Sequence, residues 1–530
     1  MHAAADCPYD APPAGVPPPR PSWRAVAAGP AAKGPAMSVL RYVCLSDLHL
    51  GADYSLLTGR HGGHADPGKP GKCLLALGAA VRPLLRQLPV DTPPTLVLLG
   101  DVLDLGLSPM GDVAQAFQHV AEQAMLDEAG RPLFAPRVLV VPGNHDHHLW
   151  RQAQDHGYLQ ALRGGRIERD LADLTPPFAD GAGAPVACPL LDALLARVPA
   201  LQGSHAQIVY PNLALVDDRR QRCVVLHHGH FVDAVYRLMS TINALMDSDA
   251  PPPTVAQLEQ QNGPWIDFLW SDLGSAGATG RTATTLYEVM RDGGASQQYL
   301  EGLSNLVLDK LSSGLGLSGR MTVTQGVALA PLVRAAIDAT VGRGAQSQRD
   351  SYLDLITLAD VADLRWYLDG PVRQQLEGHG LDPSALDMAF VYGHTHKPLQ
   401  DELPLPGGGR PVAVFNTGGW VMDQPTMTRT QGAAAVFIDD ALNLASLRLF
   451  TDPVDGVMDP VQAAGTGGVR DRANPMLAAL HQAVQATQAA WVPFSQAVQR
   501  SIEHRAQVLL ERHFDTDPAG TDTVTTPGTP

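Results

Sequence analysis

Six short apolar runs, each followed directly by a cluster of polar residues, constrain the fold of this 530-residue chain more than any other feature. The runs are rich in Val, Leu or Ile and turn residues bound most of them, which predicts buried strands. They lie at 42–45, 95–99, 138–141, 223–226, 388–392 and 412–415. Similar runs predict further strands at 208–210, 434–438 and 447–450.

Helical patterns at 74–88 and 113–126 lie between the first of these runs. Strands that alternate with helices indicate a layered α/β fold. In such folds ligands bind outside the carboxyl ends of the strands, where each polar cluster begins. The sequence therefore predicts one shared site to which six strands contribute.

The polar clusters contain residues of the types that bind metal ions. Asp47 and His49 follow the first strand, and His394 and His396 repeat this spacing after the fifth. Residues two apart at the end of a strand point to the same side, so we expect each pair to reach one ion together. Asp101 offers two oxygens that could bridge two ions. A single cluster could serve a turn, but five in this order indicate a metal site, and imidazole is a common ligand. The clusters read SDLHLG (46–51), GDVLD (100–104), GNHD (143–146), HHGH (227–230), GHTH (393–396) and NTGGW (416–420).

Composition excludes several classes of function. The formal net charge of −16 argues against sequence-independent binding to nucleic acid, which depends on many Lys and Arg contacts. The five cysteines are far apart and include no CxxC, so we expect reduced thiols in a cytoplasmic protein rather than disulfides or a thiolate zinc site. No apolar stretch approaches 18 residues, and no secretory signal is recognisable, so no transmembrane segment is predicted.

The chain divides into six segments in this interpretation. Residues 1–36 form a disordered extension, or precede a true start at Met37. Residues 37–230 and 386–465 form the two parts of the core, and 466–515 form a C-terminal segment with one helix at 476–513. Residues 516–530 are a disordered tail.

Residues 231–385 interrupt the strand pattern and are predicted to be mainly helical. Apolar residues recur at helical spacing from Phe231 to Met246 and again over 300–311. The first stretch indicates a core helix or a lipid pocket. Because the insertion lies between two ligand clusters, it is predicted to act as a cap or lid, with hinges near the glycines at 274–280 and 314–319.

The ordered set of clusters resembles the calcineurin-like metallophosphoesterase superfamily over about 38–450, apart from the insertion. The resemblance implies a layered β-sandwich flanked by helices. It also implies two divalent ions, about 3.5–4 Å apart, that share a bridging hydroxide. Manganese is the preferred metal, with iron, zinc or nickel as alternatives for a mixed N/O ligand set. The implied ligands are Asp47, His49 and His396 for the first ion, Asn144, His228 and His394 for the second, and Asp101 for both.

The remaining residues of the clusters take supporting roles in this resemblance. His145 would donate a proton or stabilise negative charge on the phosphoryl group. Asp146 would orient the ring of His145. Asp104 and Asn416 would support the site through hydrogen bonds, or serve only as turn caps. His227 and His230 compete with His228 for one ligand position.

Departures from the patterns of two branches of this superfamily argue against both branches. Leu105 stands where protein Ser/Thr phosphatases carry Arg, and Asp104 where purple acid phosphatases carry Tyr. The SDLHL opening and GHTHKP resemble the lipid A pathway's UDP-diacylglucosamine pyrophosphatase, but His145 replaces its Arg.

The predicted function is therefore hydrolysis of a small phosphodiester or phosphomonoester. One alternative is a pyrophosphatase that acts on a nucleotide-linked lipid at a membrane surface, with peripheral lipid contact. The other is a catalytically silent, metal-bound scaffold.

Overall fold

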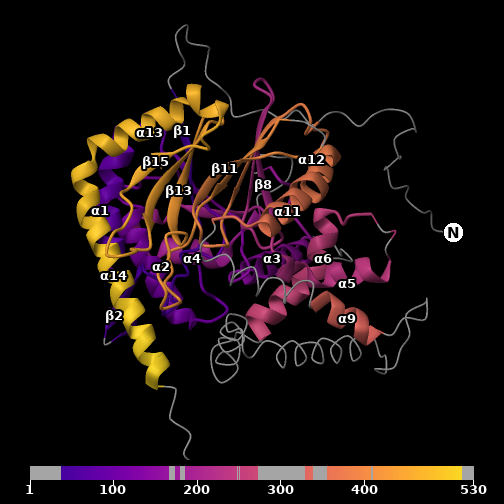
Figure 1. Ribbon diagram of the computed structural model, residues 1–530, viewed down its shortest axis with the longest axis horizontal. Helices are drawn as coiled ribbons and strands as arrows, with labels where there is room; N and C mark the ends of the chain where they lie inside the picture. Colours follow the sequence, from indigo (N-terminus) through magenta and orange to yellow (C-terminus); the bar gives the residue numbers. More distant parts are fainter. Residues whose placement is uncertain are drawn as a thin grey trace, which may run out of the picture.

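The computed structural model describes residues 38–61, 63–165, 173–178, 186–247, 249, 251–272, 329–337, 355–406 and 410–515. Within them, two stacked β-sheets form the centre and helices cover both outer faces (Figure 1). This confirms the predicted α/β class and the helix-flanked sandwich. The predicted disordered segments 1–36 and 516–530, the apolar stretch 300–311 and the hinges at 274–280 and 314–319 lie outside the described residues.

The larger sheet has eight strands and a parallel middle formed by β1, β4, β5 and β7. Helices return the chain between these strands, as parallel pairing requires. The predicted strand at 208–210 is wrong in its bounds, since the strand there ends at Ile208. In spatial order the strands are β15 (Gln462–Ala464), β14 (Leu444–Thr451), β13 (Gly432–Asp439), β1 (Leu40–Leu45), β4 (Thr95–Leu98), β5 (Arg137–Val140), β7 (His205–Ile208) and β6 (Val186–Ala187).

The smaller sheet has five strands, of which the inner three run parallel. The two edge strands pair antiparallel, and neither was predicted from the sequence. In spatial order the strands are β11 (Leu399–Leu403), β12 (Val412–Asn416), β10 (Asp387–Tyr392), β9 (Arg222–His227) and β8 (Asn212–Asp217). A separate hairpin of β2 (Thr58–His61) and β3 (His64–Pro70) packs against α2 (Met110–Ala124).

The apolar interior between the sheets follows from the alternation of side chains along each strand. In β9, Val224 and Leu226 point toward the larger sheet, whereas Cys223 and Val225 point toward the insertion. Both faces of this strand are therefore buried, which explains why its sequence is an uninterrupted apolar run.

Helices from both ends of the chain cover the outer face of the larger sheet. α14 lies along α1 at one side of the molecule (Figure 1). The single helix predicted at 476–513 is divided, because Thr487 leaves the helical conformation with φ −111° and ψ 14°. The helices outside residues 231–385, besides α2, are α1 (Lys72–Gln87), α3 (His148–Arg163), α4 (Pro189–Ala196), η1 (Pro199–Leu201), η6 (Val469–Ala473), α13 (Pro475–Ala486) and α14 (Gln488–Asp515).

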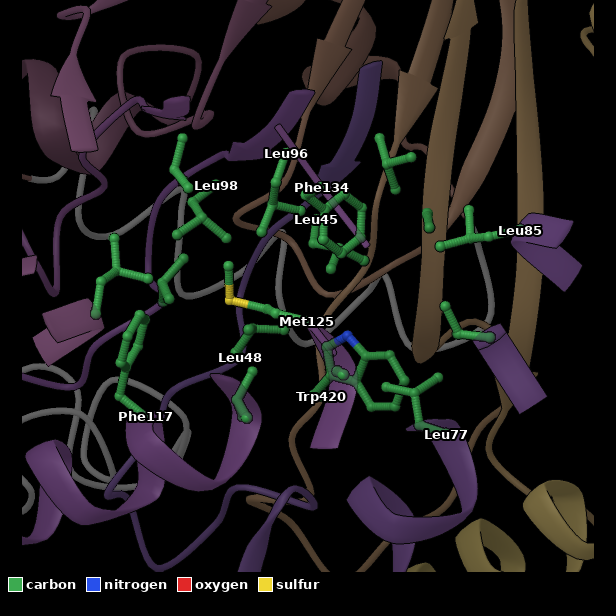
Figure 2. A pocket seen from close by; sticks show the side chains of 18 of the residues that line it. Leu45, Leu48, Leu77, Leu85, Leu96, Leu98, Phe117, Met125, Phe134 and Trp420 are labelled. Atoms are coloured by element: carbon green, nitrogen blue, oxygen red, sulfur yellow. The ribbon is translucent and has the colours of Figure 1, made fainter. Parts of the chain in front are cut away.

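An apolar cavity of about 60 Å³ lies under the same face of the larger sheet. Figure 2 shows the side chains of Leu98, Phe117, Met125 and Trp420 around it. A cavity lined in this way remains dry. It therefore belongs to the core and offers no polar group for chemistry.

Short helices from the described part of the predicted insertion cover the outer face of the smaller sheet (Figure 1). The predicted helix that begins at Phe231 starts later, with a 3₁₀ turn followed by α5, and its apolar residues pack in the core. The described helices are η2 (Ala234–Arg237), α5 (Leu238–Met246), α6 (Val255–Asp267), η3 (Phe268–Asp272), α9 (Leu329–Ile337), α11 (Leu358–Tyr367), η5 (Leu368–Val372) and α12 (Arg373–Gly378). Among the described helices, none combines the length and apolar character needed to span a membrane.

Candidate metal centre

Loops at the carboxyl ends of strands from both sheets meet at one place. The backbone N–H of Asp47 donates to Gly100 O at 3.0 Å, and that of His49 donates to Asp101 O at 2.9 Å. In the smaller sheet, the N–H of Gly393 donates to His228 O at 2.7 Å. The polar clusters after β1 and β4 are therefore joined to each other through their backbones, and so are the clusters after β9 and β10.

Five of the seven predicted metal ligands have left-handed backbone conformations. Their φ angles are 53° at Asp47, 44° at His49, 49° at Asp101, 70° at His394 and 57° at His396. The expectation that Asp47 and His49 point to the same side through strand alternation is therefore wrong, because these residues lie in turns and not in an extended strand end. Non-glycine residues adopt such conformations at a cost of about 1–3 kcal/mol, and the arrangement is typical of functional sites.

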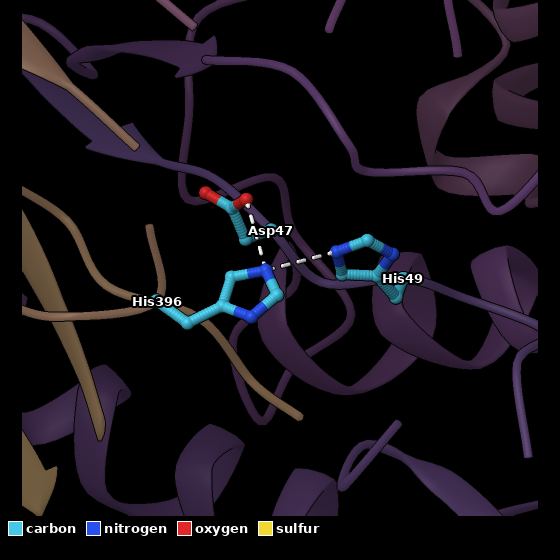
Figure 3. A group of neighbouring side chains, drawn as sticks. All are labelled: Asp47, His49 and His396. Carbon is cyan, nitrogen blue, oxygen red and sulfur yellow. Dashed lines mark hydrogen bonds and ion pairs between the residues drawn. The ribbon is translucent and has the colours of Figure 1, made fainter. Parts of the chain in front are cut away.

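Asp47, His49 and His396 form a first group of candidate ligands, here called the first ligand group (Figure 3). His396 Nε2 lies 3.3 Å from His49 Nε2 and 3.4 Å from Asp47 Oδ1. Two imidazole nitrogens that face each other can have at most one proton between them, because two N–H groups would repel each other. A cation between them would accept lone pairs from both rings and from the carboxylate, so the donor set fits a divalent metal ion.

Asp101, Asn144, His228 and His394 form a second group of candidate ligands, here called the second ligand group. His228 Nε2 lies 3.0 Å from Asn144 Oδ1 and 3.3 Å from Asp101 Oδ2, and His394 also offers a nitrogen to this cluster. His228 Nδ1 donates to the carbonyl of Leu99 at 3.0 Å, which directs Nε2 at the other donors. Asp101 Oδ2 is also 3.9 Å from His49 Nε2, so this carboxylate lies between the two groups.

The three neighbouring histidines have different surroundings. His228 faces the other ligands, whereas His227 Nδ1 accepts from the backbone N–H of Gly229 at 2.8 Å. His230 Nε2 faces the hydroxyl of Tyr210 at 3.3 Å. Burial, reinforced by neighbouring histidines, lowers the pKa of His227 and of His230 well below the usual range, so both are neutral. The geometry thus favours His228 over the two alternatives as a ligand.

His145 lies beside the first ligand group, and Asp104 holds its ring. His145 Nδ1 is 2.9 Å from Asp104 Oδ1, and Asp104 accepts further hydrogen bonds from Tyr54 at 3.1 Å and Ser108 at 2.6 Å. The indole ring of Trp270, in the π-helix η3, lies 3.8 Å from the imidazole between ring centres. Burial would lower the pKa of His145, but the negative charges of Asp101 and Asp104 outweigh it and raise the pKa.

Asp146 does not orient the ring of His145, contrary to the expectation from the sequence. Its carboxylate accepts backbone hydrogen bonds from Gly143 at 2.6 Å, Val102 at 2.9 Å and Asp101 at 3.2 Å. Burial and the charge of Asp101 raise its pKa to about 6. Asp146 thereby fixes the second and third clusters relative to each other.

Asn416 acts on the loop that carries the two C-terminal histidines. Its amide nitrogen donates to Gly393 O and to Thr395 Oγ1, both at 3.0 Å. Its amide oxygen accepts from the N–H of Gly418 at 2.7 Å. These contacts are the support through hydrogen bonds that the sequence suggested as one role for this residue.

Glycines let the carboxylates approach the loops closely. A Cβ added at Gly393 would overlap Asp47 Oδ2, and one added at Gly143 would overlap Asp101 Oδ1. Both ligand carboxylates are at most 2% exposed. Burial would raise the pKa of Asp101, but the charge of His228 outweighs it and holds the pKa well below its usual range.

Sequence reasoning missed several residues at the centre. Tyr54 and Ser108 support Asp104, and three residues of the insertion contact predicted site residues: Asp233, Tyr236 and Trp270. Asp233 and Tyr236 follow the fourth cluster within six residues, which was the available signal. Nothing in the sequence marks Trp270, because its proximity depends on how the insertion folds back.

A comparison with protein-family models found a match over part of the chain. Residues 40–270 match the model described as calcineurin-like phosphoesterase. The matched region includes the first four clusters and ends before His394 and His396. A search of curated proteins found no match.

Proposed function

The chain belongs to the calcineurin-like metallophosphoesterase superfamily, and from this premise we propose that it hydrolyses a phosphoric ester with a dinuclear metal centre. The observation that carries the proposal is the position of Asp101 Oδ2, 3.3 Å from His228 Nε2 and 3.9 Å from His49 Nε2. A carboxylate in this position can serve both ligand groups at once.

The proposed ligands are Asp47, His49 and His396 for one ion, Asn144, His228 and His394 for the other, and Asp101 for both. Nitrogen and oxygen donors in this mixture suit manganese, the preferred metal, or iron, zinc or nickel. Such ions neutralise charge on a phosphoryl group and lower the pKa of water.

His145 is the proposed catalytic residue outside the ligand set. Asp104 engages Nδ1, so Nε2 is the nitrogen available to a substrate. Through this nitrogen the ring can donate a proton to the leaving oxygen or stabilise negative charge on phosphorus-bound oxygens. Trp270 covers the ring and restricts water access to it.

The proposed substrate is a small phosphodiester or phosphomonoester, and the proposed location is the cytoplasm. The cysteines in the described part of the chain, Cys44, Cys73, Cys188 and Cys223, are buried and free, which supports a reducing compartment.

Hydrolysis of p-nitrophenyl phosphate and bis-p-nitrophenyl phosphate tests the proposal. We expect Mn²⁺-dependent release of nitrophenol, with rates reduced about 10²- to 10⁴-fold in Asp101→Asn and His145→Ala. The control is His148→Gln, an exposed histidine on α3. Absence of turnover with Mn²⁺, Fe²⁺, Zn²⁺ or Ni²⁺ would leave two interpretations, a lid that is closed to these model substrates or the catalytically silent scaffold. Equal rates in the wild type and both variants would reject the site.

A further inference from the structure

Resting on the proposed function, we propose that the insertion is an integral part of the second metal subsite. In this role Asp233 and Tyr236 are positioning residues for His394 and Asn144. The insertion would then do more than cover the substrate, since one ion depends on it and the other does not.

The contact between Asp233 and His394 fixes which imidazole nitrogen is available to an ion. Asp233 Oδ2 lies 3.2 Å from His394 Nε2. Because Nε2 is engaged there, Nδ1 is left to face the second ligand group. The other oxygen of the carboxylate accepts from the N–H of Val235 at 2.9 Å, at the start of η2. The carboxylate is thus held at both oxygens, and it holds the ring in turn.

Tyr236 acts on two members of the second ligand group. Its hydroxyl accepts from Asn144 Nδ2 at 3.1 Å, so the amide oxygen faces His228 Nε2 at 3.0 Å. The tyrosine ring also meets the ring of His394 edge-on, 5.2 Å between centres. An amide in the opposite orientation would present a donor to the ion instead of an oxygen. The hydroxyl of Tyr236 therefore selects the ligating end of Asn144.

The position of these two residues depends on the folding of the insertion. The indole N–H of Trp265, in α6, donates to Val235 O at 2.9 Å. Arg237 donates to Val232 O at 3.1 Å and pairs with Asp363 in α11. Two helices that are distant in the sequence thereby fix the turn that contains Asp233 and Tyr236.

The first ligand group is held by the core instead. Ser46 donates to Asp47, and the backbone N–H of His394 donates to the same carboxylate at 3.0 Å. Tyr54 lies 3.5 Å from His49 Nδ1. A change in the insertion that leaves these contacts intact should therefore weaken the binding of one ion only.

Calorimetric titration of the full metal-free chain with Mn²⁺ tests this separation. We expect two ions to bind the wild type. Asp233→Asn keeps one side-chain oxygen that can accept from the Val235 N–H, as Asn does at other helix caps. Tyr236→Phe keeps the aromatic ring and removes only the hydroxyl. In each variant we expect one affinity within threefold of the wild-type value and the other weaker by about 10- to 100-fold, as for other residues that orient ligands.

The matched control for the hydroxyl is Tyr367→Phe. Tyr367 is a fully buried residue of the insertion, and its hydroxyl donates to Asn212 Oδ1 at 3.1 Å. The substitution Tyr367→Phe should leave the affinities for both Mn²⁺ ions unchanged. The melting temperature of each variant, measured without metal, verifies that it folds. Because the two substitutions are independent, one folded variant is enough for the test.

A second background identifies the subsite. His49→Ala removes a ligand of the first group, so the ion that remains should occupy the second subsite, and adding Asp233→Asn should weaken that ion by the same 10- to 100-fold. Equal weakening of both ions, or unchanged affinities, would overturn the inference. Hydrolysis does not enter this readout, so a chain that binds two ions and cleaves no ester would refute the proposed function alone.

Discussion

Replacing His147 by glutamine should remove a pH-dependent part of the stability that connects the core to the insertion. His147 precedes α3 and is 2% exposed. Its Nδ1 lies 2.6 Å from Asp267 Oδ1, and its Nε2 lies 3.2 Å from Glu259 Oε1, with both acids on α6. Burial would lower the pKa of His147, but the charge of Glu259 and the hydrogen bonds to both acids raise it to about 9.

The sign and size of the effect follow from this pKa. A histidine whose pKa rises from the ordinary 6.5 to about 9 on folding stabilises the folded state fully below pH 6.5. This contribution is lost as the pH rises through 9, and it amounts to about 3 kcal/mol in total. Glutamine retains hydrogen-bonding groups but carries no proton in this range, so the variant lacks this pH-dependent contribution.

Urea unfolding at pH 6, 7.5 and 9.5 measures the effect. The free energy of unfolding of the wild type should exceed that of His147→Gln most at pH 6, and the difference should shrink by roughly 2–3 kcal/mol by pH 9.5. The control is His148→Gln, the exposed neighbour on α3. Parallel pH curves for the wild type and His147→Gln would show that this buried ion-paired network does not carry the charge assigned to it.

Three further predictions concern the centre and the core. Gly393→Ala should reduce hydrolysis at least 100-fold, since the methyl group would overlap the carboxylate of Asp47, whereas Gly378→Ala, with open space around it, should retain the wild-type rate. Asp452 is 2% exposed, and burial raises its pKa to about 7. Asp452→Asn, which can still accept the Thr428 N–H, should therefore be more stable than the wild type at pH 8 by roughly 2–4 kcal/mol. Equal unfolding free energies of the two proteins at pH 8 would contradict this. Chelation of metal should lower the melting temperature by several degrees and abolish turnover, and Mn²⁺ should restore both; a chelator-treated sample with unchanged melting and activity would argue against bound ions.

The inner strands of both sheets could largely be predicted from the sequence. Strands buried on both faces, such as β9, β10 and β12, appear as continuous apolar runs. The edge strand β11 was missed, because its sequence LQDEL is mostly polar and contains no continuous apolar run. The bounds of the helix after Phe231 were wrong for a different reason, since the preceding turn is shaped by contacts with α6 and α11 that helical periodicity does not report.

The resemblance to the superfamily and the polar residues near the centre could be predicted from the sequence alone. Residue type and order after each strand are enough for this, because the carboxyl ends of parallel strands share an edge. How these residues act on one another depends instead on the three-dimensional arrangement of the chain. Left-handed turns, not strand alternation, direct Asp47 and His49. Asp104, 41 residues away, and not the adjacent Asp146, holds the ring of His145.

The tertiary structure also brought Asp233, Tyr236 and Trp270 of the insertion against His394, Asn144 and His145. Such contacts depend on the packing of distant segments. The side chains come within hydrogen-bonding distance of one another only after these segments have packed together. Local patterns record which residues end a strand, but they contain no information about which distant side chain will meet them.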